Sequence, residues 1–265
     1  MVSGSQAVKV TAKAALKNNW LKAIIACSIL IFTVFICYNA ASVFSIVAGD
    51  IGGSILLILG TVFLTCPIAL GLLRYYWRIL FNAQDNPISV FYYFSDKSLY
   101  RRALGLILSL VLRAIFWGIL LNIPVLIVNI MSGSFFYELT GAAIPMWTAN
   151  LTNLEIFLKA VSYVLLFFIM LRYYMAPVLF VADDNMDNAE AMHMSSIISK
   201  KTSIDFIYLL FSFFGWILLS IFVVPLGFTL PYILTSYLVH VRFAVAEYNR
   251  HIELSAKNSF PSFIV

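Results

Sequence analysis

Charged residues are scarce in this chain. Asp, Glu, Lys and Arg together make up 11% of its 265 residues, whereas a soluble domain carries about 25%. A chain so poor in charge cannot cover its own surface in water. The hydrophobic content of 62% and the mean hydropathy of +0.96 therefore exclude an ordinary soluble domain and indicate an integral membrane protein.

Histidine and cysteine are also few, with three residues of each. Cys27, Cys37 and Cys66 lie inside apolar runs without a CxxC pair, which is typical of buried apolar residues rather than metal or redox sites. No H-E-x-x-H, Walker, nucleophile–base or paired-carboxylate motif occurs. We therefore predict a non-enzyme without catalytic residues, metal or cofactor. His240, on the last apolar run, fits either a hydrogen-bonded packing residue or a proton relay.

Long apolar runs fill most of the chain. Because a spanning helix needs about 20 apolar residues, the predicted fold class is all-α: a polytopic transmembrane helix bundle forming one domain over 20–248. About six spans are expected, near 20–47, 54–81, 103–131, 156–182, 204–224 and 228–248. Pro225-Leu226-Gly227 separates the last two, which form either a tight hairpin or a broken pair that crosses only in part.

The two ends of the chain differ from this domain. Residues 1–19 are predicted to form an amphipathic helix on the membrane surface, because Val8, Ala12 and Leu16 recur at helical spacing while lysines line another face. Residues 249–265 are predicted to form a cytoplasmic tail.

The distribution of basic residues predicts the orientation. Lys and Arg occur in 82–102, 183–203 and 249–265, whereas 48–53 and 132–155 contain none. By the positive-inside rule, the first three segments and both termini are expected on the cytoplasmic side of the membrane. The net charge of +5 comes from short clusters beside apolar runs, which favours anionic membrane lipids as partners and not nucleic acid.

Two cytoplasmic loops are predicted to hold interfacial helices. Asn86 can cap the first helix, with Pro87 in its first turn. Asp187 and Glu190 have the spacing of a capping box at the start of the second. Their apolar faces comprise Ile88, Phe91, Tyr92 and Leu99 in the first, and Ala191, Met194 and Ile198 in the second. Such helices either brace the bundle or bind a membrane protein partner.

The chain contains an internal repeat. Leu73-Arg74-Tyr75-Tyr76 recurs as Leu171-Arg172-Tyr173-Tyr174. An Asp/Asn-rich turn, an interfacial helix and a span with Trp117 or Trp216 follow each copy. Both copies lie in spans that run from outside to inside, so the repeat is parallel. Parallel repeats occur in transporters and also arise from plain duplication.

Three motifs carry a resemblance to a known family. These are Leu16-Lys17-Asn18-Asn19-Trp20, Pro67-Ile68-Ala69-Leu70-Gly71-Leu72 and Ala189-Glu190-Ala191. The chain resembles domain of unknown function 975, a family of bacterial, mostly Gram-positive, polytopic membrane proteins. That family is similar in turn to the membrane domain beside some glycerophosphodiester phosphodiesterases. The resemblance implies the fold and assigns no catalytic residue.

Three arginines fall within the predicted spans. Arg113 lies eleven residues beyond Arg102, or about 16 Å along a helix, which is near the midplane of a hydrocarbon core about 30 Å thick. Arg172 should be similarly deep, and Arg74 nearer the cytoplasmic face. A charge at the centre of a spanning helix costs at least about 2.5–3.5 kcal/mol, so each needs a partner.

We therefore predict that Arg74, Arg113 and Arg172 line an intramembrane cavity that binds an anion, because a guanidinium fork suits phosphate or carboxylate. The aromatic walls would be Tyr75, Tyr76, Tyr173, Tyr174, Trp117 and Trp216. Alternatively, the arginines snorkel or bond to backbone carbonyls. The corresponding functions are binding or translocation of an anionic amphiphile or lipid, and a non-catalytic accessory or scaffold role that regulates a membrane partner.

Overall fold

The computed structural model describes residues 4–81, 85–131, 149–219 and 223–259. These residues form helices and no strands, which confirms the all-α fold class. Contacts divide the chain into two compact units. One comprises Met1–Ile107 with Tyr174–Val265, and the other comprises Leu108–Tyr173.

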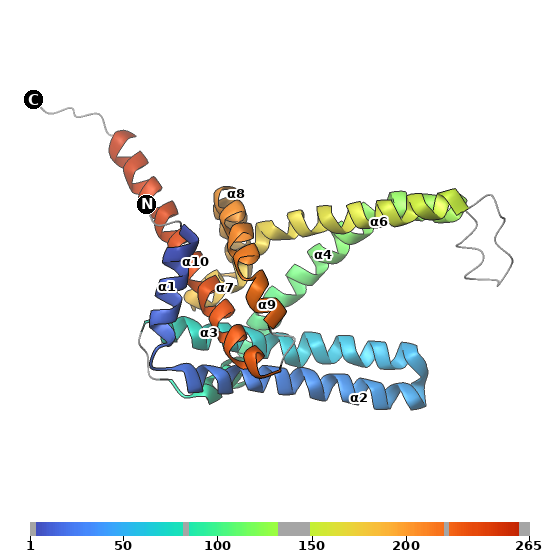
Figure 1. Ribbon diagram of the computed structural model, residues 1–265, viewed down its shortest axis with the longest axis horizontal. Coiled ribbons are helices and arrows are strands. Elements are labelled where there is room, and N and C mark those ends of the chain that lie inside the picture. The colour runs from blue at the N-terminus through green and yellow to red at the C-terminus, as the bar shows by residue number, and fades with distance from the viewer. Residues whose placement is uncertain (1–3, 82–84, 132–148, 220–222, 260–265) are drawn as a thin grey trace, which may run out of the picture. The chain divides into compact units, whose positions relative to one another are not determined.

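The first unit contains a long helical hairpin. Helix α2 (Trp20–Gly60), the π-helical stretch η1 (Thr61–Thr65) and α3 (Cys66–Leu80) form one apolar run. The run reverses at Gly49, whose φ of 72° is strained for any residue with a Cβ. The two legs lie antiparallel (Figure 1). The reversal falls within the loop expected at 48–53.

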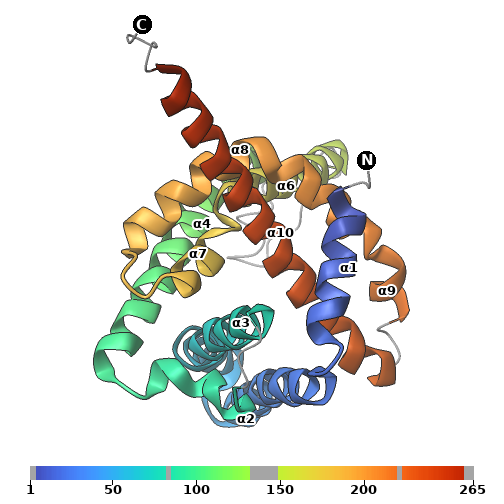
Figure 2. The same cartoon turned by 90° about the vertical axis from the view of Figure 1, so that its left-hand side faces the viewer.

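The remaining helical segments of the first unit lie against this hairpin or pack on one another. They are α1 (Gly4–Leu16), η2 (Pro87–Phe94), the start of α4 (Lys97–Met131), α7 (Ala176–Ala182), α8 (Asn188–Ser212), α9 (Phe214–Leu219) and α10 (Val223–Ser259). Figures 1 and 2 both show α1 beside α10. The expected cap of η2 is confirmed, because the Asn86 side chain accepts a hydrogen bond from the Ile88 amide at 3.2 Å.

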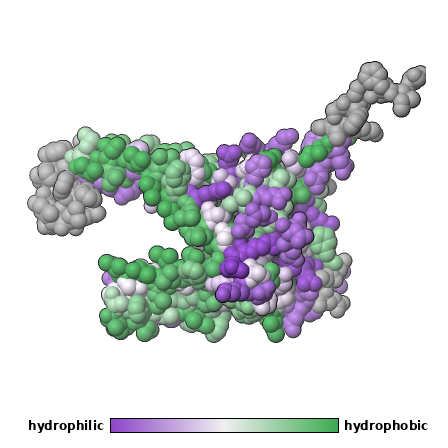
Figure 3. All heavy atoms as spheres, turned by 180° about the vertical axis from the view of Figure 1, so that it is seen from behind, coloured by the Kyte–Doolittle hydropathy of each residue, from purple (hydrophilic) through white to green (hydrophobic). Residues whose placement is uncertain are grey.

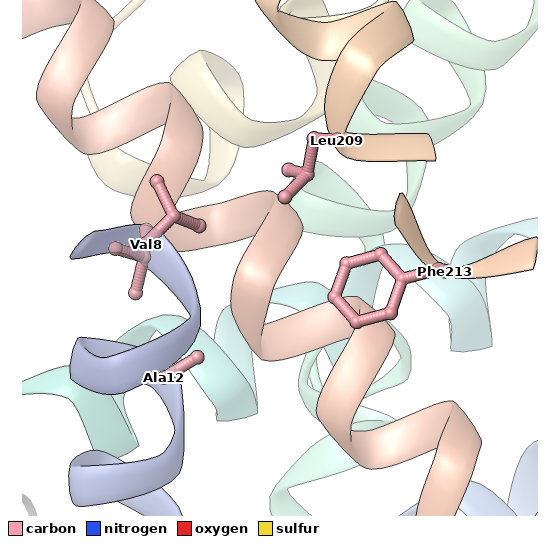
Figure 4. Close-up of a cluster of buried hydrophobic side chains, with 5 residues drawn as sticks. Val8, Ala12, Leu209 and Phe213 are labelled. Atoms are coloured by element: carbon pink, nitrogen blue, oxygen red, sulfur yellow. The ribbon is translucent and has the colours of Figure 1, made fainter. Parts of the chain in front are cut away.

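Helix α1 buries its apolar stripe in protein. Val8 and Ala12 are 3% and 0% exposed and form a cluster with Leu209 and Phe213 of α8 and its C-terminal end (Figure 4). Lys9 donates to the Ser212 carbonyl at 3.1 Å. The expected amphipathic helix is therefore present, but α8 and α10 cover its apolar face.

The C-terminal third differs from the expected arrangement. The second interfacial helix and the start of the span expected at 204–224 form one helix, α8, because no Gly or Pro interrupts the sequence between Asp187 and Phe213. Asp187 stands at its N-cap without a side-chain capping bond among the described atoms. The expected break at 225–227 is absent, because α10 already begins at Val223 and a proline is tolerated in a first turn.

The second unit is also a helical hairpin. It pairs α4, from Leu108 onward, with α6 (Ala149–Met170) and the short 3-10 turn η4 (Leu171–Tyr173). The Ser162 hydroxyl donates to the Leu121 carbonyl at 2.8 Å, which ties the antiparallel helices together near the middle of their length.

Four helical runs of the described residues are long and apolar enough to cross a membrane: Trp20–Leu80, Lys97–Met131, Asn153–Ala182 and Gly227–Leu254. The protein is therefore a membrane protein. The first run contains two legs. Within the part of the chain that the structure describes, the segment expected to span at 204–224 supplies no such run.

Candidate functional site

Arg74 is paired with a carboxylate that the sequence did not reveal as its partner. Its two terminal nitrogens bond to the two carboxylate oxygens of Asp184, with Nη2 to Oδ2 at 2.8 Å. Its guanidinium also lies 3.8 Å from the centre of the Tyr92 ring. The Arg74 guanidinium lowers the pKa of Asp184 below its usual value. The fork that a ligand anion would occupy already holds a carboxylate.

A second arginine holds the same loop. Arg102, at the start of α4, donates to the carbonyls of Asp183 at 3.1 Å and Met186 at 2.6 Å. Its guanidinium lies 4.5 Å from the Phe180 ring centre, and Phe180 stacks on Tyr93. Burial raises the pKa of Tyr93 to about 12. Arg74 and Arg102 therefore clamp the loop after α7 from two different helices.

Tyr75 and Tyr76 are core residues of α3. They are 1% and 0% exposed. The Tyr76 hydroxyl donates to the Ala23 carbonyl at 2.8 Å and lies 3.1 Å from the Cys27 sulfur. Tyr76 thus joins the two legs of the first hairpin at their base.

Tyr174 belongs to a buried polar cluster. Its hydroxyl lies 2.9 Å from His240 Nε2 and 3.3 Å from Thr202 Oγ1, and its ring stacks on Phe206 with centres 4.2 Å apart. Tyr237 donates to the Tyr174 carbonyl. This agrees with a hydrogen-bonded packing role for His240, which is 7% exposed.

A cavity of about 650 Å³ lies beside this cluster, between α1, α8 and α10. Its walls include the carboxylates of Asp205 and Glu247, the His240 ring and the aromatic side chain of Tyr208. No lysine or arginine is among the described residues that line it. Its electrostatic character is therefore opposite to that of the predicted arginine-lined cavity.

Arg113 and Arg172 lie at a similar level of the second hairpin. Leu121 faces Ser162, and counting eight residues back from Leu121 and eight forward from Ser162 brings Arg113 opposite Met170, two residues before Arg172. The Arg113 guanidinium lies 4.9 Å from the centre of the Tyr173 ring, which agrees with a position near the level of Arg172. The sequence placed the two arginines in different spans at similar depth, and the hairpin brings them to a similar level.

Polar side chains also gather at the far end of this hairpin, where they form a second polar layer in addition to that of Arg113 and Arg172. Glu155 pairs with Lys159 at 2.5 Å, as the i,i+4 spacing favours. The Asn129 amide nitrogen, with its amide oriented to donate, lies 2.6 and 2.9 Å from the Glu155 oxygens. Sixteen residues separate Asn129 from Arg113, or about 24 Å of helix.

Between the two layers the helices present apolar side chains outward. The most exposed large ones are Phe116, Ile119, Ile156, Phe157 and Tyr163, at 61–66%. Figure 3 shows hydrophobic residues over both hairpins. An apolar surface this continuous is typical of contact with lipid.

The nine residues of the predicted cavity divide between the two units. Arg74, Tyr75, Tyr76, Tyr174 and Trp216 belong to the first, and Arg113, Trp117, Arg172 and Tyr173 belong to the second. In the first unit, Trp216 is 46% exposed and lies 6.0 Å, ring to ring, from Tyr232, whereas the three tyrosines and Arg74 have the contacts described above. One cavity shared by all nine stays a prediction.

Sequence reasoning missed Asp184 and Arg102 as parts of a site. The turn Asp183-Asp184-Asn185 was visible as part of the repeat, but nothing local links it to Arg74, which is 110 residues away. In the sequence, Arg102 was interpreted only as one of the basic residues on the cytoplasmic side. The available signal in the sequence was the pair of acidic residues in this turn, because a buried arginine needs a carboxylate or carbonyl groups nearby.

A family described as "Protein of unknown function (DUF975)" matches residues 1–245. The chain therefore belongs to the DUF975 family. No curated protein and no solved structure matches it. The likeness to the membrane domain beside phosphodiesterases stays an expectation.

Proposed function

We propose that this member of the DUF975 family is a non-catalytic protein of the bacterial cytoplasmic membrane that binds the phosphate headgroups of anionic lipids through Arg113 and Arg172. Both termini lie on the cytoplasmic side. The observation that carries the proposal is the similar level of the two arginines on a hairpin that presents many exposed large apolar side chains.

The length of the hairpin supports an interfacial position for this pair. If the layer of Asn129 and Glu155 marks the outer boundary, Arg113 lies about 24 Å from it. A hydrocarbon core of about 30 Å then places Arg113 about 6 Å inside the inner boundary, within reach of headgroups for a long side chain. This placement replaces the midplane position expected from counting inward from Arg102.

Two guanidinium groups at that depth suit a lipid phosphate. Each offers a planar set of donors that matches a phosphate oxygen pair, and the exposed aromatic and aliphatic side chains beyond them suit acyl chains. Arg172 is exposed in η4, so a headgroup can approach it from the side. Arg74 is left out of the proposed site because Asp184 occupies its fork.

Native mass spectrometry of the purified protein tests the proposal. An arginine near a charged membrane surface contributes about 1 kcal/mol, so Arg113→Leu and Arg172→Leu should each weaken phosphatidylglycerol binding about 5-fold. Arg250→Leu, which removes an exposed charge from α10, is the matched control. Unchanged phosphatidylglycerol binding in the double variant would refute the proposal.

Competing ligands identify what is recognised. Phosphatidylglycerol should bind more tightly than phosphatidylcholine, and the preference should disappear in the double variant. Displacement by millimolar inorganic phosphate would show that the phosphate alone is recognised rather than the lipid. Equal binding of both lipids by the native chain would count against charge recognition.

The scaffold role is the second candidate. Its support is the clamp in which Arg74 and Arg102 hold the loop after α7, because these arginines act within the protein rather than on a ligand. A rigid polar body above membrane helices offers a surface to a membrane partner. Detergent-extracted complexes that survive loss of Arg113 and Arg172 would favour this role.

A further inference from the structure

The start of α10 lies next to the start of the first hairpin. The Phe228 ring centre is 6.0 Å from that of Trp20, and the Cβ position of Gly227 is 3.8 Å from the Ile24 side chain. In the chain just before α9, Ser212 is bonded to Lys9 of α1. These contacts lie within the first unit, and they place the start of α10 at the base of α2 and the end of α8 against α1.

The position of the start of α10 is inconsistent with a segment that has just crossed the membrane. The first leg of α2 runs from Trp20 to its reversal at Gly49, so Gly49 lies 25 residues beyond Ile24, or about 38 Å along the helix. If the chain had crossed the membrane from the same side before α10, the start of α10 would lie near Gly49. The start of α10 instead lies at the level where α2 begins.

The described residues on both sides of this point are apolar, and their large side chains are exposed. Residues 206–239 contain no Asp, Glu, Lys or Arg. The large side chains that face outward are Phe211 at 72%, Phe214 at 59%, Phe228 at 51% and Trp216 at 46%. A monomeric protein rarely leaves so many large apolar side chains in water, and Leu21 at the start of α2 is 73% exposed as well.

We propose that α9 and the start of α10 form a non-crossing hairpin that inserts into the inner leaflet beside the base of α2. Its apolar face contacts membrane lipid at the boundary between headgroups and acyl chains. Interfacial helices bury their apolar faces about 5–10 Å deep at this boundary. The chain then crosses the membrane four times, through the two legs of each helical hairpin, and the run Gly227–Leu254 does not cross although its length and composition would allow it.

The charge distribution supports this topology. Four crossings leave both termini on one side, as the basic residues of α1 and of the C-terminal end require. Helix α10 leads from its apolar start to Arg242, Glu247 and Arg250. Glu247 lies 19 residues beyond Phe228, or about 28 Å away along the helix, so the cavity that it lines would open to the cytosol.

Cysteine labelling in intact cells tests sidedness. Phe228→Cys should remain unlabelled by a membrane-impermeant maleimide, as should Lys200→Cys, whereas Asp50→Cys beside Gly49 should label. After permeabilisation, Lys200→Cys should label as well. The unsubstituted chain measures the background of its native thiols. Labelling of Phe228→Cys from outside, to the extent seen for Asp50→Cys, would overturn the proposal.

A nitroxide attached to the same cysteine tests membrane contact in liposomes. Relaxation by oxygen should exceed relaxation by a water-soluble nickel chelate, with a depth less than half that of a label at Phe35→Cys in the middle of α2. A label at Phe228→Cys that is as deep as Phe35→Cys, or relaxed mainly by the chelate, would contradict the proposal. Neither measurement depends on lipid binding by Arg113 or Arg172.

Discussion

Replacing Gly71 by alanine should detach η2 from α3. A Cβ built on Gly71 would lie 1.8 Å from the Val90 carbonyl oxygen and 2.8 Å from its carbon, whereas ordinary contacts begin at 3.4 Å. The obstructing atoms are backbone, which no change of rotamer can move aside. Segment η2 must therefore shift by about 1.5 Å or leave its place, which exposes Val90 and Tyr93, now 0% and 2% exposed.

The expected cost follows from this overlap. Overpacking a core costs about 1–3 kcal/mol, and 1 kcal/mol shifts the melting temperature of a chain of this size by about 2–4 °C. Gly71→Ala should therefore lower Tm by about 2–12 °C. Thermal unfolding in detergent, followed by tryptophan fluorescence, measures this shift. Hydrogen exchange over 87–94 should accelerate in parallel, because those residues lose their packing surface.

Gly118→Ala is the matched control. Gly118 also lies inside a helix, but nothing is within 4 Å of its Cβ position. Alanine is favoured over glycine in a helix interior by about 0.5–1 kcal/mol, so Tm should stay constant or rise slightly. If Gly71→Ala melted at the wild-type temperature, the close approach of η2 to α3 would be wrong.

Two further predictions concern caps and pH. Because Arg74 lowers the pKa of Asp184 in the folded protein, this carboxylate adds stability at neutral pH that is lost as pH falls through the folded pKa. Asp184→Asn should therefore lower Tm at pH 7 and make little difference well below pH 4, and a constant difference between melting curves would contradict the ion pair. Asn86→Ala removes the cap on the Ile88 amide and costs about 1 kcal/mol. It should speed hydrogen exchange over 87–94 about 5-fold, and unchanged exchange would show that the cap is dispensable.

Local patterns accounted for much of the architecture. Helical spacing predicted α1, the Asn86 cap preceded η2, and the apolar runs placed the legs of both hairpins. These features depend on neighbouring residues, since side-chain period and capping act over a few positions. The Asp/Asn turns are also visible in the sequence, although their partners are not, and the orientation stays a prediction from the basic residues.

Hydropathy alone does not decide how the C-terminal third is arranged. An apolar stretch near 204–224 is long enough to span a membrane, and the same composition suits helices that pack against α1 and lie at the base of α2. The choice depends on which surfaces cover Phe213 and Leu209. Those surfaces come from residues about 200 positions earlier, at Val8 and Ala12.

Composition and periodicity therefore indicate the membrane environment of this protein, its helical class and the approximate level of each charge along its run, including the similar depth of Arg113 and Arg172. The folded chain is needed to see that Arg74 is paired with Asp184. It also shows that the Arg113 guanidinium lies against the Tyr173 ring and that the start of α10 lies beside Trp20. The difference comes from the sequence separation over which each interaction acts. Composition and periodicity depend on neighbouring residues, whereas a buried charge or an apolar segment contacts residues that are far away in the chain.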